Sequence, residues 1–164
     1  MKALVIYDSF FSNTEKIAQA IGQEISSGEV LHVSKVAPDH LTGLDLLVVG
    51  SPTRSFNASP AIMEMLKDIP QKGLKGIKVT AFDTRFPQSV IAETKSLAFF
   101  VKLWGRAAFA DKHIEALLKK RGGELVVPSM GFYVTGVEGP LMDSEIERAE
   151  HWAEEILAAL GVIT

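Results

Sequence analysis

The segment Asp8-Ser9-Phe10-Phe11-Ser12-Asn13-Thr14 is rich in small hydroxyl side chains and interrupts two apolar patterns. The run before it, Ala3 to Tyr7, is short, apolar and partly β-branched, which predicts a buried strand. The run after it places Ile17, Ile21 and Ile25 at four-residue spacing, which is one face of a helix. The sequence therefore predicts a strand, a polar loop and a helix start in succession.

The loop has the composition of an anion site. Ser12 and Glu15 have capping-box spacing, so we expect the helix to begin inside the loop. A helix start leaves backbone N–H groups without partners and carries the positive end of the helix dipole. We expect a phosphate to bind there, with side-chain donors from Ser9, Ser12, Asn13 and Thr14. The alternative is that these residues form only a turn and a helix cap.

Other phosphate-binding motifs are absent from the sequence. There is no G-x-x-x-x-G-K-[ST], which disfavours a nucleoside triphosphate site. There is no G-x-G-x-x-G after the first strand, which disfavours a dinucleotide site. Asp8 stands beside the expected phosphate, which its charge would repel, so we expect its side chain to point away and cap a turn.

Composition excludes several classes of protein. The 164 residues are 47% hydrophobic and 23% charged, which predicts a single domain over residues 1–164. A net charge of -3 gives no argument for nucleic-acid binding, since proteins of that class carry basic patches. No apolar run reaches membrane-spanning length, so we expect no membrane association. The chain has no cysteine, which fits the cytoplasmic location that we expect.

Strand-like and helix-like patterns alternate along the rest of the chain. This alternation predicts an α/β fold with parallel strands joined by right-handed helical crossovers. The expected strands are residues 3–7, 30–33, 44–50, 77–82 and 125–127, the last continued at 132–134. Further helices are expected from residues 59–60, over 89–104 and 107–121, and from 143 or 144. Ligands of such sheets bind at the carboxyl ends of the strands, which points to the loops after residues 7, 50 and 82.

The second and third of these loops combine aromatic and hydrogen-bonding residues. The second loop consists of Ser51, Pro52, Thr53, Arg54, Ser55, Phe56 and Asn57, and the third of Asp83, Thr84, Arg85 and Phe86. We expect Phe56 and Phe86 to clasp a planar heterocycle, because exposed aromatic rings offer stacking surfaces. The alternative is that either ring packs into the core. Arg54 and Arg85 are candidates to contact the oxygens of the heterocycle, or to remain solvated.

These residues resemble the flavodoxin family in its short, single-domain type. The matching residues are Tyr7-Asp8-Ser9-x-x-Ser12-Asn13-Thr14-Glu15-Lys16-Ile17-Ala18, Gly50-Ser51-Pro52-Thr53, Phe82-Asp83-Thr84-Arg85, and Gly136-Val137-Glu138-Gly139-Pro140-Leu141 with Glu147-Arg148-Ala149. The resemblance implies a doubly wound, five-stranded parallel sheet in the order 2-1-3-4-5, with helices on both faces. It also implies non-covalent FMN at the carboxyl edge. The Phe10 and Phe11 amides would then join the phosphate loop, and the second and third loops would flank the isoalloxazine ring.

Two features depart from the family pattern. Members usually have glycine at the position of Ser12, and a serine fits that turn only where φ need not be strongly positive. Flavodoxins commonly stack Trp and Tyr on the flavin ring, whereas the candidates here are Phe56 and Phe86. The resemblance therefore does not predict the redox potential of a flavin bound to this chain.

The resemblance implies an FMN-binding electron-transfer protein with a redox partner protein or reductase, and an electron carrier rather than an enzyme with its own substrate. One alternative is an NAD(P)H-dependent FMN oxidoreductase that acts on a quinone or similar acceptor. Another is a flavin-free binding module with the same fold. We identify no catalytic residue and expect no metal site, because the four histidines are scattered.

The stretch Leu97 to Trp104 is apolar on all sides. It predicts a helix that is wedged into the core or folded over the sheet edge. The alternative is a surface for self-association or for an apolar substrate.

Overall fold

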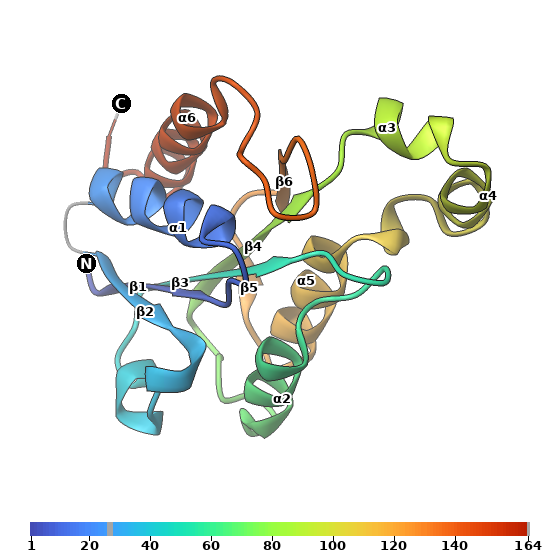
Figure 1. Ribbon diagram of the computed structural model, residues 1–164. Coiled ribbons are helices and arrows are strands. Elements are labelled where there is room, and N and C mark those ends of the chain that lie inside the picture. The colour runs from blue at the N-terminus through green and yellow to red at the C-terminus, as the bar shows by residue number, and fades with distance from the viewer. Residues whose placement is uncertain (26–27, 164) are drawn as a thin grey trace.

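The short apolar runs of the sequence form the strands of one parallel sheet in the computed structural model, which describes residues 1–25 and 28–163 (Figure 1). The strands are β1 (Ala3–Tyr7), β2 (Gly28–His32), β3 (Leu46–Pro52), β4 (Lys78–Arg85), β5 (Glu124–Leu125) and β6 (Met130–Tyr133). They run in the order β2-β1-β3-β4-β5, and β6 also pairs with β4. The predicted order 2-1-3-4-5 is confirmed.

The expected fifth strand consists of two short pieces. β5 pairs with the start of β4 at Lys78 and Val79, and β6 pairs with its end, from Phe82 to Arg85. Pro128 lies between the two pieces and has no backbone N–H to give to the ladder. The interruption allows β6 to extend the carboxyl edge of the sheet, where the ligand was expected.

Helices cover both faces of the sheet (Figure 1). One face carries α1 (Asn13–Glu24) and α6 (Glu145–Ala159), and the other carries α2 (Pro60–Asp68) and α5 (Ala110–Lys120). Because the central strands are covered on both sides, they are apolar almost without interruption, as Leu46 to Val49 illustrates. Ser59 caps α2 by accepting from the Ile62 N–H at 3.4 Å, as its position before Pro60 predicts.

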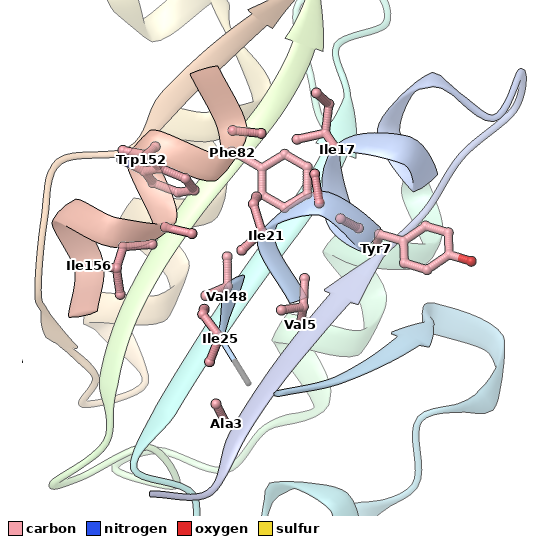
Figure 2. Close-up of a cluster of buried hydrophobic side chains, with 14 of the residues drawn as sticks. Ala3, Val5, Tyr7, Ile17, Ile21, Ile25, Val48, Phe82, Trp152 and Ile156 are labelled. Carbon is pink, nitrogen blue, oxygen red and sulfur yellow. The ribbon is translucent and has the colours of Figure 1, made fainter. Parts of the chain in front are cut away.

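A large core lies between the sheet and the helices α1 and α6. Figure 2 shows Ile17 and Ile21 of α1 together with Val48 and Phe82 of the sheet and Trp152 of α6, all of them buried. The Trp152 ring meets the Phe82 ring edge to face at 6.4 Å between centroids. The predicted face of α1 therefore packs where the spacing of its isoleucines placed it.

Two further helices, α3 (Gln88–Glu93) and α4 (Lys95–Trp104), project beyond the carboxyl edge of the sheet (Figure 1). The helix expected over residues 89–104 is thus two helices, which meet at Thr94. Phe99 and Leu103 of α4 are 63% and 65% exposed, so the prediction that this segment is buried is wrong for them. The side chains of Leu97, Phe100 and Trp104 lie outside the described residues.

The 3-10 helices are η1 (Val33–Lys35), η2 (Pro38–Leu41) and η3 (Gly105–Ala108). η3 occupies the segment where the helix over 107–121 was expected to begin, and that helix, α5, begins only at Ala110. Over residues 1–25 and 28–163, no helix combines the length and the apolar character that a membrane crossing requires.

Candidate functional site

The three loops expected to form a site converge on one cavity of about 280 Å³ at the carboxyl edge of the sheet. This volume lies near the lower limit of about 300 Å³ for ligand pockets. Its walls come from four segments of the chain. The lining residues are Ser9, Phe10, Phe11, Asn13, Thr14, Pro52, Thr53, Arg54, Ser55, Thr84, Arg85, Phe86, Val134, Gly136 and Val137.

Five residues of the expected site do not line the cavity: Ser12, Ser51, Phe56, Asn57 and Asp83. Ser51 is fully buried, and its Oγ accepts from the Ser59 N–H at 2.8 Å, so it holds the start of α2. The Asn57 Oδ1 accepts from the Ala58 N–H at 2.9 Å. These two side chains stabilise the second loop and its exit. Phe56 is half-buried and does not line the cavity, whereas Phe86 is half-buried and lines it.

The fourth segment was not in the expected site. Val134, Gly136 and Val137 follow β6 and form part of the cavity wall. Gly136 and Val137 belong to a stretch that carried the family resemblance, but nothing in their side chains suggested ligand chemistry. The signal available was their position after the last strand, because ligands of parallel sheets gather at the carboxyl ends.

The first loop offers hydrogen-bond donors that have no partner. No acceptor is recorded among the described residues for the backbone N–H groups of residues 10–15. The Ser9 Oγ is buried and has no hydrogen-bond partner among the same residues. An unsatisfied buried hydroxyl costs free energy, so this atom is suited to a ligand acceptor.

Ser12 takes the turn that the family pattern gives to glycine. Its backbone lies in the left-handed region, at φ 61° and ψ 2°, and its side chain makes no capping hydrogen bond. The predicted capping box with Glu15 is therefore wrong, because a left-handed residue does not have the extended backbone of a normal N-cap. The chain makes the tight turn at the cost of backbone strain in a non-glycine residue.

Asn13 and Thr14 tie the first loop to the other walls. The Asn13 Nδ2 donates to the Glu138 carbonyl at 3.0 Å, and a Cβ atom at Gly139 would lie 2.5 Å from the same nitrogen. The Thr14 Oγ1 lies 2.8 Å from the Thr84 Oγ1, and both residues are buried. Both side chains therefore hold the segments of the cavity wall together.

Asp8 points away from the cavity, as expected. Its Oδ1 accepts from the Ser9 N–H at 2.9 Å and lies 3.2 Å from the His32 Nε2 at the end of β2. Beside it, the Tyr7 hydroxyl donates to the Glu15 Oε1 at 2.8 Å. Burial and the Glu15 carboxylate raise the pKa of Tyr7 to about 12, so the phenol stays protonated.

Arg54 stacks on the two aromatic residues of the first loop. Its guanidinium carbon lies 4.7 Å from the centroid of the Phe10 ring and 5.2 Å from that of Phe11. Arg54 and Asn57 exchange two backbone hydrogen bonds of 2.9 Å around Ser55 and Phe56, which both have positive φ. This tight turn presents Arg54 at the cavity mouth, where cation–π contact connects the first and second loops.

Arg85 is held by carboxylates inside the cavity wall. Its Nε donates to the Asp83 Oδ1 at 2.6 Å, and its Nη2 lies 2.6 Å from the Asp111 Oδ1. The Thr53 hydroxyl donates to the other oxygen of Asp83. A Cβ at Gly131 would lie 2.4 Å from the guanidinium carbon, so glycine there makes room for the side chain. This arrangement favours neither of the roles expected for Arg85, because the guanidinium is neither solvated nor unpaired.

Burial raises the pKa of Asp83 to about 6, against a usual value of 3.8. Arg85 and the Thr53 hydroxyl act in the opposite direction, and the negative charge of Asp111 adds to the effect of burial. Two buried carboxylates thus share one guanidinium. The buried region behind the third loop therefore contains two carboxylates, Asp83 and Asp111, for one guanidinium, Arg85, which is an excess of negative charge.

A second cavity, of about 1000 Å³, lies between the segment of η1 and η2 and the helix α2. Its walls contain Val36, Leu41, Met65 and Ile69, and none of the expected site residues. Within the part of the chain that the structure describes, no group of three or more His, Asp or Glu side chains is arranged to hold a metal ion. Of these two cavities, the smaller one brings the expected polar loops together.

The sequence of the chain has limited similarity to known proteins. No protein-family model matches the chain. An uncharacterized protein of Methanocaldococcus jannaschii is 42% identical over 76 residues, which are 46% of this chain and 50% of that protein. The chain thus aligns with half the length of this curated relative.

Solved structures are similar over nearly the whole chain. A flavodoxin from the domain Archaea has 21% identity and a TM-score of 0.67, with 99% of both chains covered. Oxidised flavodoxin 1 from Bacillus cereus has 18% identity and a TM-score of 0.71, with 96% of this chain and 98% of that chain covered. The chain has the flavodoxin-like fold.

This flavodoxin-like fold also occurs within a longer protein. The rubredoxin oxygen:oxidoreductase of Desulfovibrio gigas has 19% identity and a TM-score of 0.71, and the match covers 98% of this chain but 36% of that chain. The resemblance drawn from the sequence motifs is therefore confirmed for the fold.

Replacement of Ser12 by glycine is expected to stabilise the protein. Glycine adopts a positive φ without the steric cost that serine bears, so the free energy of unfolding should rise by about 0.5 to 1 kcal/mol. Urea denaturation measures the change. Ser96→Gly in α4 is the control, because helical backbone gives glycine no such advantage and this variant should lose stability. Loss of stability in Ser12→Gly would contradict the assigned strain.

Asp83 is expected to make stability fall as pH rises. The folded state holds a proton on Asp83 more tightly than the unfolded state, whose aspartate titrates near 3.8. The contribution of this proton is complete below pH 3.8 and is lost as pH rises through about 6. Urea denaturation between pH 4 and 7 should show this slope in the wild type and a flatter one in Asp83→Asn. The exposed Asp39→Asn is the control, and equal slopes in all three proteins would refute the assignment.

Proposed function

We propose that this protein binds FMN without a covalent bond and transfers electrons through it. The observation that carries the proposal is a set of donors in the first loop and the first turn of α1 that have no partner among the described residues: the N–H groups of residues 10–15 and the buried Ser9 hydroxyl. A phosphate monoester supplies acceptor oxygens and negative charge, and a helix N-terminus favours both. The neutral donors of the loop fit this group without a lysine or arginine.

The other walls fit the remainder of the ligand. Phe10, Phe11 and Phe86 line the cavity and offer aromatic surface to a planar ring. Because the cavity is small, we propose that it holds the phosphate and its chain, with the ring at the mouth beside Arg54. Phe56 lies outside the cavity lining, so we assign the contact with the ring to Phe86 rather than to Phe56.

The flavin would supply the redox chemistry, and the chain would supply position and electrostatics. The excess negative charge of the third loop would disfavour further negative charge on the ligand, because Arg85 is already paired with Asp83 and Asp111. The flavodoxin-like fold supports a role as electron carrier by analogy. We therefore propose a redox partner protein as the source or acceptor of electrons, and a cytoplasmic location.

Titration with FMN and with riboflavin, followed by quenching of flavin fluorescence, tests this function. Riboflavin lacks the phosphate, so we expect it to bind about 100-fold more weakly than FMN. Ser9→Ala should weaken FMN about tenfold, because one hydrogen bond to a charged group is lost, and should leave riboflavin unchanged. The exposed Ser34→Ala is the control. Equal affinity for the two flavins would overturn the phosphate site, and no saturation would leave a flavin-free binding module.

We also propose self-association through the segment Leu97 to Trp104. The exposure of Phe99 and Leu103 supports it, because contiguous exposed apolar surface marks interaction sites. Light scattering coupled to size-exclusion chromatography should give a dimer for the wild type and a monomer for the double variant Phe99→Ser, Leu103→Ser. A wild-type monomer at all concentrations would refute this part of the proposal.

A further inference from the structure

Thr53 connects the cavity to the buried carboxylates behind it. The residue lines the cavity, and its hydroxyl donates to the Asp83 Oδ2. The Thr53 Oγ1 also accepts from the Ala110 N–H at 2.9 Å. A hydroxyl group has one hydrogen and two acceptor positions. While Asp83 is ionised, the Thr53 hydrogen is therefore committed to this carboxylate, and a ligand in the cavity cannot receive it.

The surroundings of Asp83 favour proton uptake. Asp83 is fully buried, and its charged neighbours are Arg85 on the same strand and Asp111 on α5. Farther along α5, Glu115 is paired with Lys112 at 2.8 Å. Among the described side chains, the other neighbouring segments present hydroxyl groups or glycine here. These are Ser51 on β3, which pairs with Asp83, Thr53 directly after β3, Ser129, whose Oγ lies 2.9 Å from the Asp111 Oδ2, and Gly131 on β6.

We propose that Asp83 and Thr53 form a proton-controlled hydrogen-bond switch in the cavity wall. In the switched state, Asp83 has taken up a proton from solvent on Oδ2 and donates it to the Thr53 Oγ1. The hydroxyl oxygen then accepts from both Asp83 and the Ala110 N–H, and its own hydrogen is released towards the cavity. The ligand that this hydrogen suits is a molecule that places a hydrogen-bond acceptor, such as a carbonyl or phosphate oxygen, against Thr53.

Ligand binding and proton uptake are linked by this switch. A ligand that accepts from Thr53 stabilises the protonated form of Asp83, and by reciprocity the protonated form binds that ligand more tightly. The raised pKa of Asp83, about 6, places the switch near neutral pH. For FMN as the ligand, this inference rests on the proposed function.

The flavin-free protein tests the switch itself by ¹³C NMR between pH 4 and 8. We expect the Asp83 carboxyl carbon and the Thr53 Cβ to titrate with one shared midpoint near pH 6. In Thr53→Val the midpoint of Asp83 should rise, because its carboxylate loses a donor. In Asp111→Asn it should fall, because a neighbouring negative charge is removed. A Thr53 signal that does not follow Asp83 would overturn the proposal.

Calorimetry of FMN binding in buffers of different ionisation enthalpy at pH 6.5 tests the linkage. The wild type should take up about half a proton more than Asp83→Asn, whose amide donates to Thr53 at every pH. Thr53→Ser keeps the hydroxyl and should match the wild type, whereas Thr53→Val should match Asp83→Asn. The FMN phosphate contributes equally to all four proteins.

Equal proton uptake by the wild type and Asp83→Asn would overturn the linkage. If no heat of FMN binding is detected in any of the buffers, the proposed function is contradicted, but the switch is not. The titration of the flavin-free protein then decides whether the switch exists.

Discussion

The architecture of the site depends on one constraint: the first N–H groups of a helix have no acceptors within that helix. β1 ends in the middle of the sheet, between β2 and β3, and α1 begins a few residues later. The N–H groups of residues 10–15 are thereby placed at the carboxyl edge, and none of them has a backbone acceptor among the described residues. The links from Asn13 to Glu138 and from Thr14 to Thr84 hold this loop in position against the backbone strain of the left-handed turn at Ser12.

The distribution of charge around the cavity follows from the same arrangement. The two arginines of the expected site are both engaged, Arg54 with the rings of Phe10 and Phe11 and Arg85 with buried carboxylates. The first loop is left with neutral donors, while the wall behind the third loop carries the two carboxylates of Asp83 and Asp111 against the single guanidinium of Arg85. The cavity therefore combines a site suited to an anion with a wall that resists additional negative charge, and Asp83 is where a proton relieves that conflict.

Much of this structure could be predicted from apolar periodicity and turn residues. The apolar runs predicted the strands, because a parallel strand covered on both faces is apolar almost without interruption. The strand order 2-1-3-4-5 was implied by the resemblance to the flavodoxin family. The exposure of Phe99 and the roles of Asp83 and Arg85 could not be predicted, since they depend on contacts between distant segments. The capping box failed because spacing alone does not report that Ser12 has a positive φ. The residues after β6 have side chains without ligand chemistry, so neither their composition nor their part in the family resemblance identified them as cavity wall.

The central claim is that uncharged donors of the first loop hold a phosphate. Amide ¹H–¹⁵N correlation spectra of residues 10–15 test it most directly, because an N–H that donates to a phosphate oxygen moves its proton signal downfield. The account predicts large downfield shifts of these amides with FMN and small ones with riboflavin. FMN that binds while these amides stay unmoved would contradict it.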